Sequence, residues 1–316
     1  MRLLAGPGPR RTDGLPRRLI GGIAQRGSRG RIRIGISGWR YAPWRGRFYP
    51  EGLRQKDELA FASAKFGAIE INGTFYSLQR PEDFERWAAA TPAGFMFAVK
   101  GPRYITHMLK LRNVEAPLAN FCANGVLALG PKLGPILWQF PPNFRYDREK
   151  LEGFFRLLPR DTETAARLAR RHDHRVDGRT RFAIDRNRRL RHAIEIRHDS
   201  FRAPDFIALL RKHRVALVCA DTVEWPLAMD LTADFVYCRL HGSEELYVSG
   251  YDDPALRRWA ALVSAWAKGQ DPRAAEHISP EPAPARQSRD VFVFFDNDAK
   301  VRAPVDAARL MEIIGT

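Results

Sequence analysis

The chain has 316 residues, of which 45% are hydrophobic and 28% are charged, a normal composition for a globular protein. No apolar run reaches the roughly 18 residues of a membrane span, and no apolar segment follows the arginine-rich start, so we expect neither a membrane protein nor a secreted one. Three distant cysteines form no CxxC pair and no zinc spacing, which favours a reducing, cytoplasmic compartment.

The net charge of +16 is concentrated in two segments. Residues 1–31 carry eight arginines and one aspartate, and residues 160–191 carry eleven arginines and five acidic residues. Basic arms of this kind can bind the phosphate backbone of a nucleic acid, but they can equally be solvated surface. The charge therefore belongs to appendages and says little about the body of the fold.

Residues 1–30 are rich in Gly, Pro and Arg without apolar periodicity, so we expect a disordered basic arm before one domain at 31–316. From residue 31 onward, short apolar runs alternate with amphipathic stretches, which is typical of βα units around a parallel sheet. The strand-like runs are Ile32–Ser37, Ala68–Phe75, Phe95–Gly101, Pro135–Phe140, His192–Arg197, Ala216–Thr222, Phe235–Gly242 and Val291–Asp296.

Helical patterns lie between these runs, several with a proline suited to a first helical turn. The clearest are Lys56–Phe66, Pro81–Ala90, Arg148–Leu158, Ala203–His213, Pro254–Lys268 and Val305–Ile314, and Pro117–Leu129 is weaker. Eight strands with intervening helices predict an α/β protein of the (β/α)₈ (TIM) barrel type. A doubly wound open sheet is the alternative, but no glycine-rich dinucleotide turn supports it.

Two segments interrupt this rhythm. Residues 160–191 are predicted to be a basic insertion, with one helix near Thr164–Arg171. Residues 271–289 contain four prolines and are predicted to be a flexible loop. Neither has the pattern of a second domain.

Several predicted strands alternate polar and apolar residues, although strands buried on both faces usually read as continuous apolar runs. Because the apolar face must meet the helices, the charged residues of these strands are expected to point into the barrel. We expect Glu70, Glu195 and Arg239 deep in the interior. A second layer nearer the C-terminal mouth is expected to contain Ser37, Asn72, Lys100, Gln139, Arg197, Asp221 and His241.

Functional groups of this fold gather at the C-terminal mouth. Lys100 and Arg197 are predicted to hold a phosphate or carboxylate, supported by Arg103, because cationic donors make the strongest contacts to such groups. His241 or His107 is the candidate for proton transfer, with Glu70 or Glu195 as base or orienting group. The other predicted ligand-binding residues are Ser37, Trp39, Asn72, Gln139, Asp221, Arg239 and Asn297.

Each of these assignments has a purely structural alternative. In that alternative, the interior charges only pair with one another, because a buried charge is costly unless it is paired. Trp39 and the aromatic residues that follow it can stack on a flat ligand or pack the barrel mouth.

Metal and cofactor motifs give no further assignment. The sequence contains no GxGxxG, GxxxxGK[ST], HExxH or GxSxG motif. Carboxylates and histidines at the mouth could supply metal ligands, but their spacing matches no metal motif, so we assign no metal ligand and identify no cofactor. The metal donors considered are Glu70, His107, Glu195, Asp221 and His241.

A series of short motifs resembles the YecE-like family, a domain of unknown function (DUF72). The motifs, which follow the family's order over about residues 32–316 apart from the loop at 271–289, are Ile34–Trp39, Trp44, Phe48–Pro50, Glu70–Tyr76, Trp87, Val99–Lys100, Ile105–His107, Leu137–Pro142, Glu195–His198, Arg239–Gly242 and Phe295–Asp298. The resemblance implies a (β/α)₈ barrel but brings no established substrate, cofactor or catalytic residue. Phe201 stands where the family often has Trp, and Asp296 where it often has Asn.

Three functional interpretations remain open at this point. The first is an enzyme-like barrel that binds a small anionic or polyol ligand at its mouth. The second is a nucleic-acid-binding protein or a metal-dependent, phosphodiesterase-like barrel that uses the basic arms. The third is a non-catalytic scaffold whose interior charges are only structural.

Overall fold

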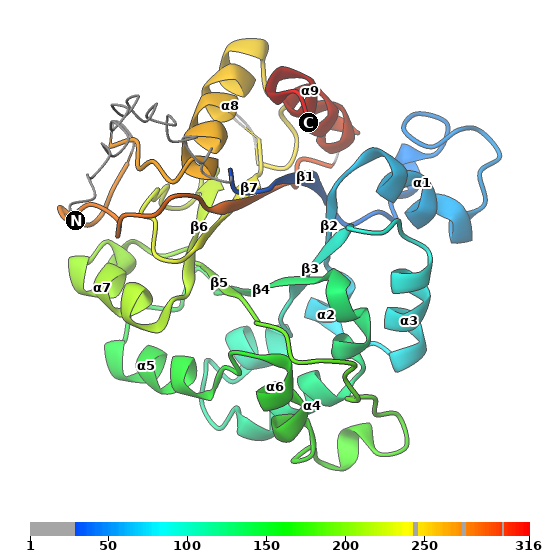
Figure 1. Ribbon diagram of the computed structural model, residues 1–316, viewed down its shortest axis with the longest axis vertical. Helices are drawn as coiled ribbons and strands as arrows, with labels where there is room; N and C mark the ends of the chain where they lie inside the picture. Colours follow the sequence, from blue (N-terminus) through cyan, green and yellow to red (C-terminus); the bar gives the residue numbers. More distant parts are fainter. Residues whose placement is uncertain (1–28, 243–245, 274–275, 299) are drawn as a thin grey trace, which may run out of the picture.

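The computed structural model describes residues 29–242, 246–273, 276–298 and 300–316. Eight parallel strands close into a barrel in chain order, and β8 pairs with β1 to complete it (Figure 1). The strands are β1 (Ile32–Ser37), β2 (Ala68–Ile71), β3 (Met96–Lys100), β4 (Leu133–Gln139), β5 (His192–Glu195), β6 (Ala216–Asp221), β7 (Phe235–Leu240) and β8 (Asp290–Phe295). This is the (β/α)₈ barrel that the sequence predicted.

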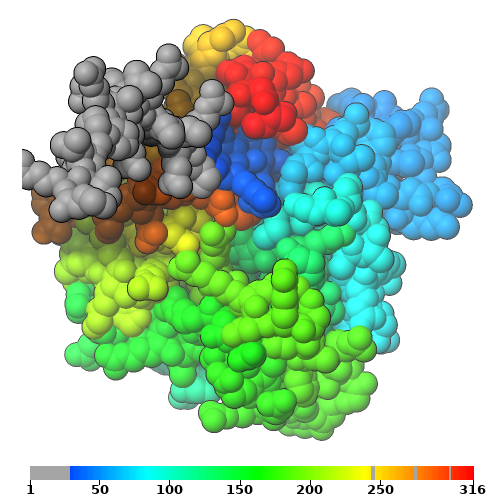
Figure 2. All heavy atoms as spheres, viewed as in Figure 1, coloured from blue at the N-terminus to red at the C-terminus, as the bar shows by residue number. Residues whose placement is uncertain are grey.

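Helices surround the barrel, with α9 beside α8 and α1 on the far side of α9 from α8 (Figures 1 and 2). They are α1 (Glu58–Lys65), α2 (Gly73–Tyr76), α3 (Pro81–Ala89), α4 (Glu115–Ala123), α5 (Arg148–Leu157), α6 (Thr162–Ala169), α7 (Pro204–His213), α8 (Asp253–Ala267) and α9 (Arg302–Ile314). Shorter 3₁₀ segments lie at Ala42–Trp44, Gln55–Asp57, Val126–Lys132, His174–Val176 and Asp199–Phe201, and a π-helical turn lies at Tyr104–Met108. None of the helices described is both long enough and apolar enough to cross a membrane.

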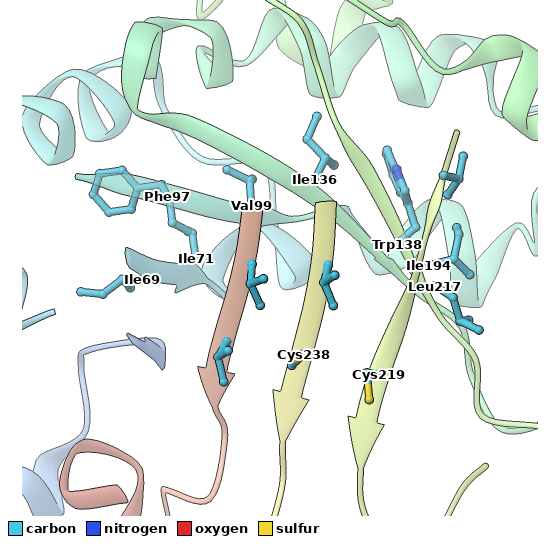
Figure 3. Packing of buried hydrophobic residues seen from close by; sticks show 14 of the residues in the cluster. Ile69, Ile71, Phe97, Val99, Ile136, Trp138, Ile194, Leu217, Cys219 and Cys238 are labelled. Atoms are coloured by element: carbon cyan, nitrogen blue, oxygen red, sulfur yellow. The ribbon is translucent and has the colours of Figure 1, made fainter. Parts of the chain in front are cut away.

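The two faces of the strands carry different side chains. On the outer face, bulky apolar residues such as Ile69, Val99 and Ile194 are buried against the helices (Figure 3). On the inner face, small residues such as Ala98 and Ala193 lie between larger polar groups. The small inner residues leave room inside the barrel for the long side chains of the charged ones.

One predicted strand is shorter than expected. The apolar run from Ala68 to Phe75 was predicted to be a single strand, but β2 ends at Ile71 and Gly73–Tyr76 forms the short helix α2. The hydroxyl of Thr74 donates hydrogen bonds to the backbone carbonyls of Ile71 at 3.1 Å and Lys100 at 2.6 Å. These bonds turn the chain and tie the end of β2 to the end of β3.

The basic segment at 160–191 packs against the barrel. Its helix α6 contacts α4, and several of its arginines pair with acidic residues elsewhere. Arg181 lies 3.2 Å from Glu85, and Arg191 lies 2.8 Å from Asp290. Part of the charge that suggested a nucleic-acid arm is therefore compensated within the fold, while residues 1–28 of the N-terminal arm lie outside the described residues.

The connection from β6 to β7 contains no helix, and all of its residues are described. The segment at 271–289, expected to be a flexible loop, packs beside it and forms no helix or strand in its described part. The buried carboxylate of Asp230 accepts hydrogen bonds from the backbone amides of Ile278 at 2.7 Å and Ser279 at 3.0 Å. Ile278 and Ala283 add apolar contacts to the core, so the segment is anchored at this place.

Candidate functional site

Arg239 occupies the centre of the barrel interior, where 1% of its side chain is exposed. Its Nη2 lies 3.0 Å from Glu70 Oε1 and 2.7 Å from Asp296 Oδ2, and its Nη1 lies 2.7 Å from Glu195 Oε2. The three carboxylates come from β2, from β5 and from the residue directly after β8. The cluster therefore links strands around the barrel through one guanidinium group.

Both carboxylate oxygens of each buried glutamate have partners. Glu70 accepts hydrogen bonds from the hydroxyls of Ser37 at 2.6 Å and Tyr237 at 2.5 Å. Glu195 accepts one from Gln139 Nε2 at 2.8 Å. Since buried carboxylates are stable only when their oxygens are paired in this way, these contacts give the charges deep in the barrel interior a structural role.

Arg197, at the end of β5, lies in the layer nearer the mouth. Its Nη2 is 2.8 Å from Glu195 Oε1, and its guanidinium carbon lies 3.9 Å from the centre of the Trp225 ring. Burial alone would raise the pKa of Glu195, but the charges of Arg239 and Arg197 outweigh it and hold that pKa well below its usual range. A carboxylate held so firmly in its anionic form orients its neighbours rather than accepting a proton.

Lys100, at the end of β3, is 8% exposed and has no anionic partner of this kind. Its Nζ lies 4.4 Å from the centre of the Phe75 ring, and across the described ranges it makes no hydrogen bond or ion pair. Burial, followed by repulsion from Arg239, lowers the pKa of Lys100 to about 8. Among the described residues, this buried ammonium is therefore a charged group of the mouth that has no acceptor.

His107 follows β3 on the π-helical turn and stands beside Lys100. Its ring meets the Phe75 ring edge-on at 5.1 Å, and its Nδ1 lies 2.9 Å from the Thr106 hydroxyl. Burial, followed by the charges of Arg197 and Lys100, lowers the pKa of His107 to about 4. The ring is therefore neutral at pH 7 and available as a hydrogen-bond partner.

His241, the other candidate for proton transfer, is fully buried. Its Nδ1 lies 3.2 Å from Asp296 Oδ2, and the rings of Trp225 and Tyr247 meet it edge-on at 5.6 Å and 5.3 Å. A ligand at the mouth reaches the half-buried His107 more readily than this enclosed ring.

Two residues predicted at the mouth point elsewhere. Asp221 shares the outer face of β6 with Cys219, and its Oδ2 accepts a hydrogen bond from Trp259 Nε1 of α8 at 3.1 Å. Asn297 donates from Nδ2 to Asp306 Oδ2 of α9 at 2.8 Å. Both side chains fasten helices to the barrel, so the placement of Asp221 and Asn297 among the mouth residues was wrong.

Arg103 and Trp39, two further predicted ligand-binding residues, differ in exposure. Arg103 is exposed, and its guanidinium carbon lies 5.6 Å from the centre of the Tyr76 ring. Trp39 is buried with its ring edge-on to Trp87 at 5.4 Å. With Asn72 it lines a hollow of about 230 Å³ beside the ends of β1 and β2, so its indole contributes a wall there and is not a free stacking surface.

Two acidic residues of the mouth, Asp296 and Asp298, were not among the predicted site residues. Asp296 continues the inward face that Phe292 and Phe294 define on β8, and this parity was the signal available in the sequence. Asp298 lies two residues further along, and burial, followed by repulsion from Asp296, raises the pKa of Asp298 to about 6. A carboxyl group with this pKa exchanges protons close to neutral pH.

The metal donors considered from sequence do not converge. Glu70 and Glu195 are bound to Arg239, and Asp221 points to α8. In the part of the chain that the structure describes, no group of three His, Cys, Asp or Glu side chains is arranged to hold a metal ion.

The fold and its interior thus define a (β/α)₈ barrel protein with a central ion cluster and a polar C-terminal mouth. The chain belongs to the family described as "Protein of unknown function DUF72", whose model matches residues 33–316. This confirms the family resemblance found in the sequence.

Curated relatives and solved structures agree with this membership. The chain is 30% identical over 113 residues to the UPF0759 protein YecE of Escherichia coli K12, which is 36% of this chain and 39% of that protein. It is 30% identical over 126 residues to the UPF0759 protein YunF of Bacillus subtilis, which is 38% of this chain and 43% of that protein. The matched regions thus span about two fifths of these relatives.

A DUF72 family protein of Thermotoga maritima superposes with a TM-score of 0.66 at 22% identity, covering 90% of this chain and all of the other. One of Enterococcus faecalis superposes with a TM-score of 0.63 at 15% identity, covering 90% and 96%. At these identities, the structural likeness bears on the fold alone.

Proposed function

We propose that the barrel mouth binds a small anionic ligand, a carboxylate or phosphate compound, through the ammonium group of Lys100. The observation that carries this proposal is that Lys100 is nearly buried and has no hydrogen-bond acceptor or counter-ion in the described residues. A buried charge without a partner is unfavourable, and an anionic oxygen at hydrogen-bond distance would supply the missing partner.

The neighbouring groups suit the same ligand. Arg197 is 13% exposed in its side chain, and its guanidinium lies over the Trp225 ring, which fixes a second cation at the mouth. His107 is neutral at pH 7 and is placed to accept a hydrogen bond or a proton from a hydroxyl group of the ligand. Ser37, Asn72 and Gln139 hold the deeper layer in place, since each is hydrogen-bonded within it.

The test compares the full-length protein with Lys100→Met, a substitution of similar length without the charge. Thermal unfolding is followed with small carboxylates and phosphates at constant ionic strength. A ligand at 100 times its dissociation constant stabilises the wild type by about 2.7 kcal/mol, and Lys100→Met abolishes this gain. Arg103→Met is the matched control, because it removes an exposed cation of the same segment and leaves the gain unchanged.

Lys100→Met also distinguishes loss of binding from loss of folding. Since the pKa of Lys100 lies near 8 and an unperturbed lysine titrates near 10.5, keeping this amine charged costs the unliganded fold about 3 kcal/mol at pH 7. The variant is therefore expected to be more stable than the wild type without ligand. A ligand-induced stabilisation that survives in Lys100→Met contradicts the proposal.

Proton uptake gives a second readout. An anion beside Lys100 favours its charged form and raises its pKa, so binding at pH 8 takes up protons from the buffer. Calorimetric titrations in buffers of different ionisation enthalpy measure this uptake. Binding without proton uptake at pH 8 would place the anion away from Lys100.

A further inference from the structure

A second hollow, of about 460 Å³, lies outside the mouth between the loop after β7, the first turns of α8 and the start of α9. We call it the cationic hollow, because Arg258 of α8, Lys300 and Arg302 line it, and all three are exposed. Figure 1 shows α8 and α9 side by side here, and the two helices are in contact.

The three cations of the hollow have no carboxylate within 4.0 Å among the described residues. The nearby acidic groups are used by other partners. Asp253 pairs with Arg309 at 2.6 Å and with Arg257 at 3.8 Å. Asp252, which also lines the hollow, accepts the backbone amide of Ala255 at 2.7 Å as the N-cap of α8. The hollow therefore gathers positive charge that the fold itself does not neutralise.

The carboxylate behind the hollow is likewise committed. Asp306 accepts hydrogen bonds from the backbone amide of Tyr251 at 3.2 Å and from Asn297 Nδ2 at 2.8 Å. Burial raises the pKa of Asp306, and the charge of Arg302 opposes that rise without an ion pair forming.

The loop backbone lets Arg302 lie along the wall of the hollow. A Cβ added at Gly250 would lie 3.1 Å from Arg302 Cδ and 3.4 Å from its Nε, which is tighter than ordinary van der Waals contact. The absence of a side chain at Gly250 thus leaves room for the guanidinium stem.

We propose that the cationic hollow binds the phosphate group of a small phosphate monoester. Guanidinium and ammonium groups bind phosphate more strongly than other side-chain groups do. A phosphate dianion between the three cations would also reduce their mutual repulsion. The loops after the seventh and eighth strands are also where barrels of this fold frequently bind phosphate. Because Asp252 caps α8, the side chains and not the helix terminus carry the site. The proposal does not depend on the mouth ligand.

The test titrates the full-length protein with inorganic phosphate and with phenyl phosphate, with sodium chloride used to hold the ionic strength constant. We expect saturable binding in calorimetry, weakened about tenfold or more by Arg258→Ala and by Arg302→Ala, since each removes a charge-assisted contact. Arg257→Ala is the matched control. It removes the neighbouring arginine of α8, which pairs with Asp253 outside the hollow, and leaves the affinity within about twofold.

Four results would overturn the proposal. The first is phosphate binding no better than chloride, and the second is phosphate binding equally well to the wild type, Arg258→Ala and Arg302→Ala. Phosphate binding lost in Lys100→Met but kept in Arg302→Ala would place the anion at the mouth, which supports the proposed function and refutes the hollow. A single-stranded oligonucleotide that binds far more tightly than phenyl phosphate, with an affinity that falls steeply with salt, would replace the small ligand with a nucleic acid.

Discussion

Replacing Arg239 with methionine removes the cation on which the interior of the barrel depends. In the wild type, Arg239 lies within 3.0 Å of the carboxylates of Glu70, Glu195 and Asp296, and Arg197 also pairs with Glu195. The variant keeps Arg197 beside Glu195 and leaves Glu70 and Asp296 without their arginine. One carboxyl group must then become protonated or remain buried without a partner.

The free-energy cost of Arg239→Met can be worked out from the protonation of one carboxyl group. Protonating a carboxyl group of ordinary pKa takes about 4 kcal/mol at pH 7 and about 1 kcal/mol at pH 5. We therefore expect Arg239→Met to lower the free energy of unfolding by about 4 kcal/mol at pH 7, within the range of roughly 3–5 kcal/mol for breaking a buried ion pair. The loss should shrink by about 3 kcal/mol between pH 7 and pH 5.

The sign of this pH dependence differs between the two proteins. In the wild type, the folded-state pKa values of Glu195 and Asp296 lie below their unfolded values, despite the opposing effect of burial, because Arg239 is present. Their stabilisation is complete above pH 5 and is lost only as the pH falls through those lowered values. In the variant, an unpaired buried carboxyl group has a raised pKa, so its penalty is largest at pH 7 and fades as the pH falls.

Urea unfolding at pH 7 and pH 5 measures both effects. The control is Arg257→Met, which breaks an exposed pair of 3.8 Å with Asp253 and should cost no more than about 0.5 kcal/mol at either pH. The reasoning is refuted if Arg239→Met costs no more than this control, or if its cost is the same at pH 5 as at pH 7.

Two further predictions concern the outer layer of the barrel. His192 is fully buried, with Trp138 Nε1 3.1 Å from its Nδ1, and burial lowers the pKa of His192 to about 4. The free energy of unfolding should therefore fall by up to about 3 kcal/mol as the pH drops from 6.5 to 4 and this ring becomes protonated. Urea unfolding of His192→Gln over the same pH range should lack this decrease. Gly101→Ala should destabilise by about 1–3 kcal/mol, because the added Cβ would lie 2.3 Å from the Trp138 ring. Gly153→Ala, within α5 and with nothing inside 4 Å of the new atom, should instead stabilise by about 1 kcal/mol in the same urea experiment.

The barrel was predictable because its rhythm is local. Each strand is a short apolar run, and alternation within β2, β5 and β7 was enough to place Glu70, Glu195 and Arg239 inside. The same rule failed for Asp221, because β6 is apolar on both faces. Its inner residue Val218 and its outer residues Leu217 and Cys219 are all apolar, so the polar residue at its end was assigned to the wrong side.

The cationic hollow was beyond the reach of such patterns. Arg258 lies near the start of α8, and the rest of that helix, the segment at 271–289 and β8 separate it in the chain from Lys300 and Arg302. None of the three belongs to a charge run, and the two basic segments that the sequence emphasised lie elsewhere. Only the pairing of β7 with β8 and the packing of α8 against α9 bring these cations to one hollow.

Lys100 is the residue at which the structural and functional explanations of the interior separate. Arg239 and Arg197 hold carboxylates at hydrogen-bond distance, so a purely structural role accounts for both. Lys100 stabilises nothing comparable, and its charge costs the unliganded fold free energy. A scaffold would gain stability from an apolar residue at this position. A residue that lowers the stability of the unliganded fold, as Lys100 does, is typical of a functional site. For this reason we test the mouth through the side chain of Lys100.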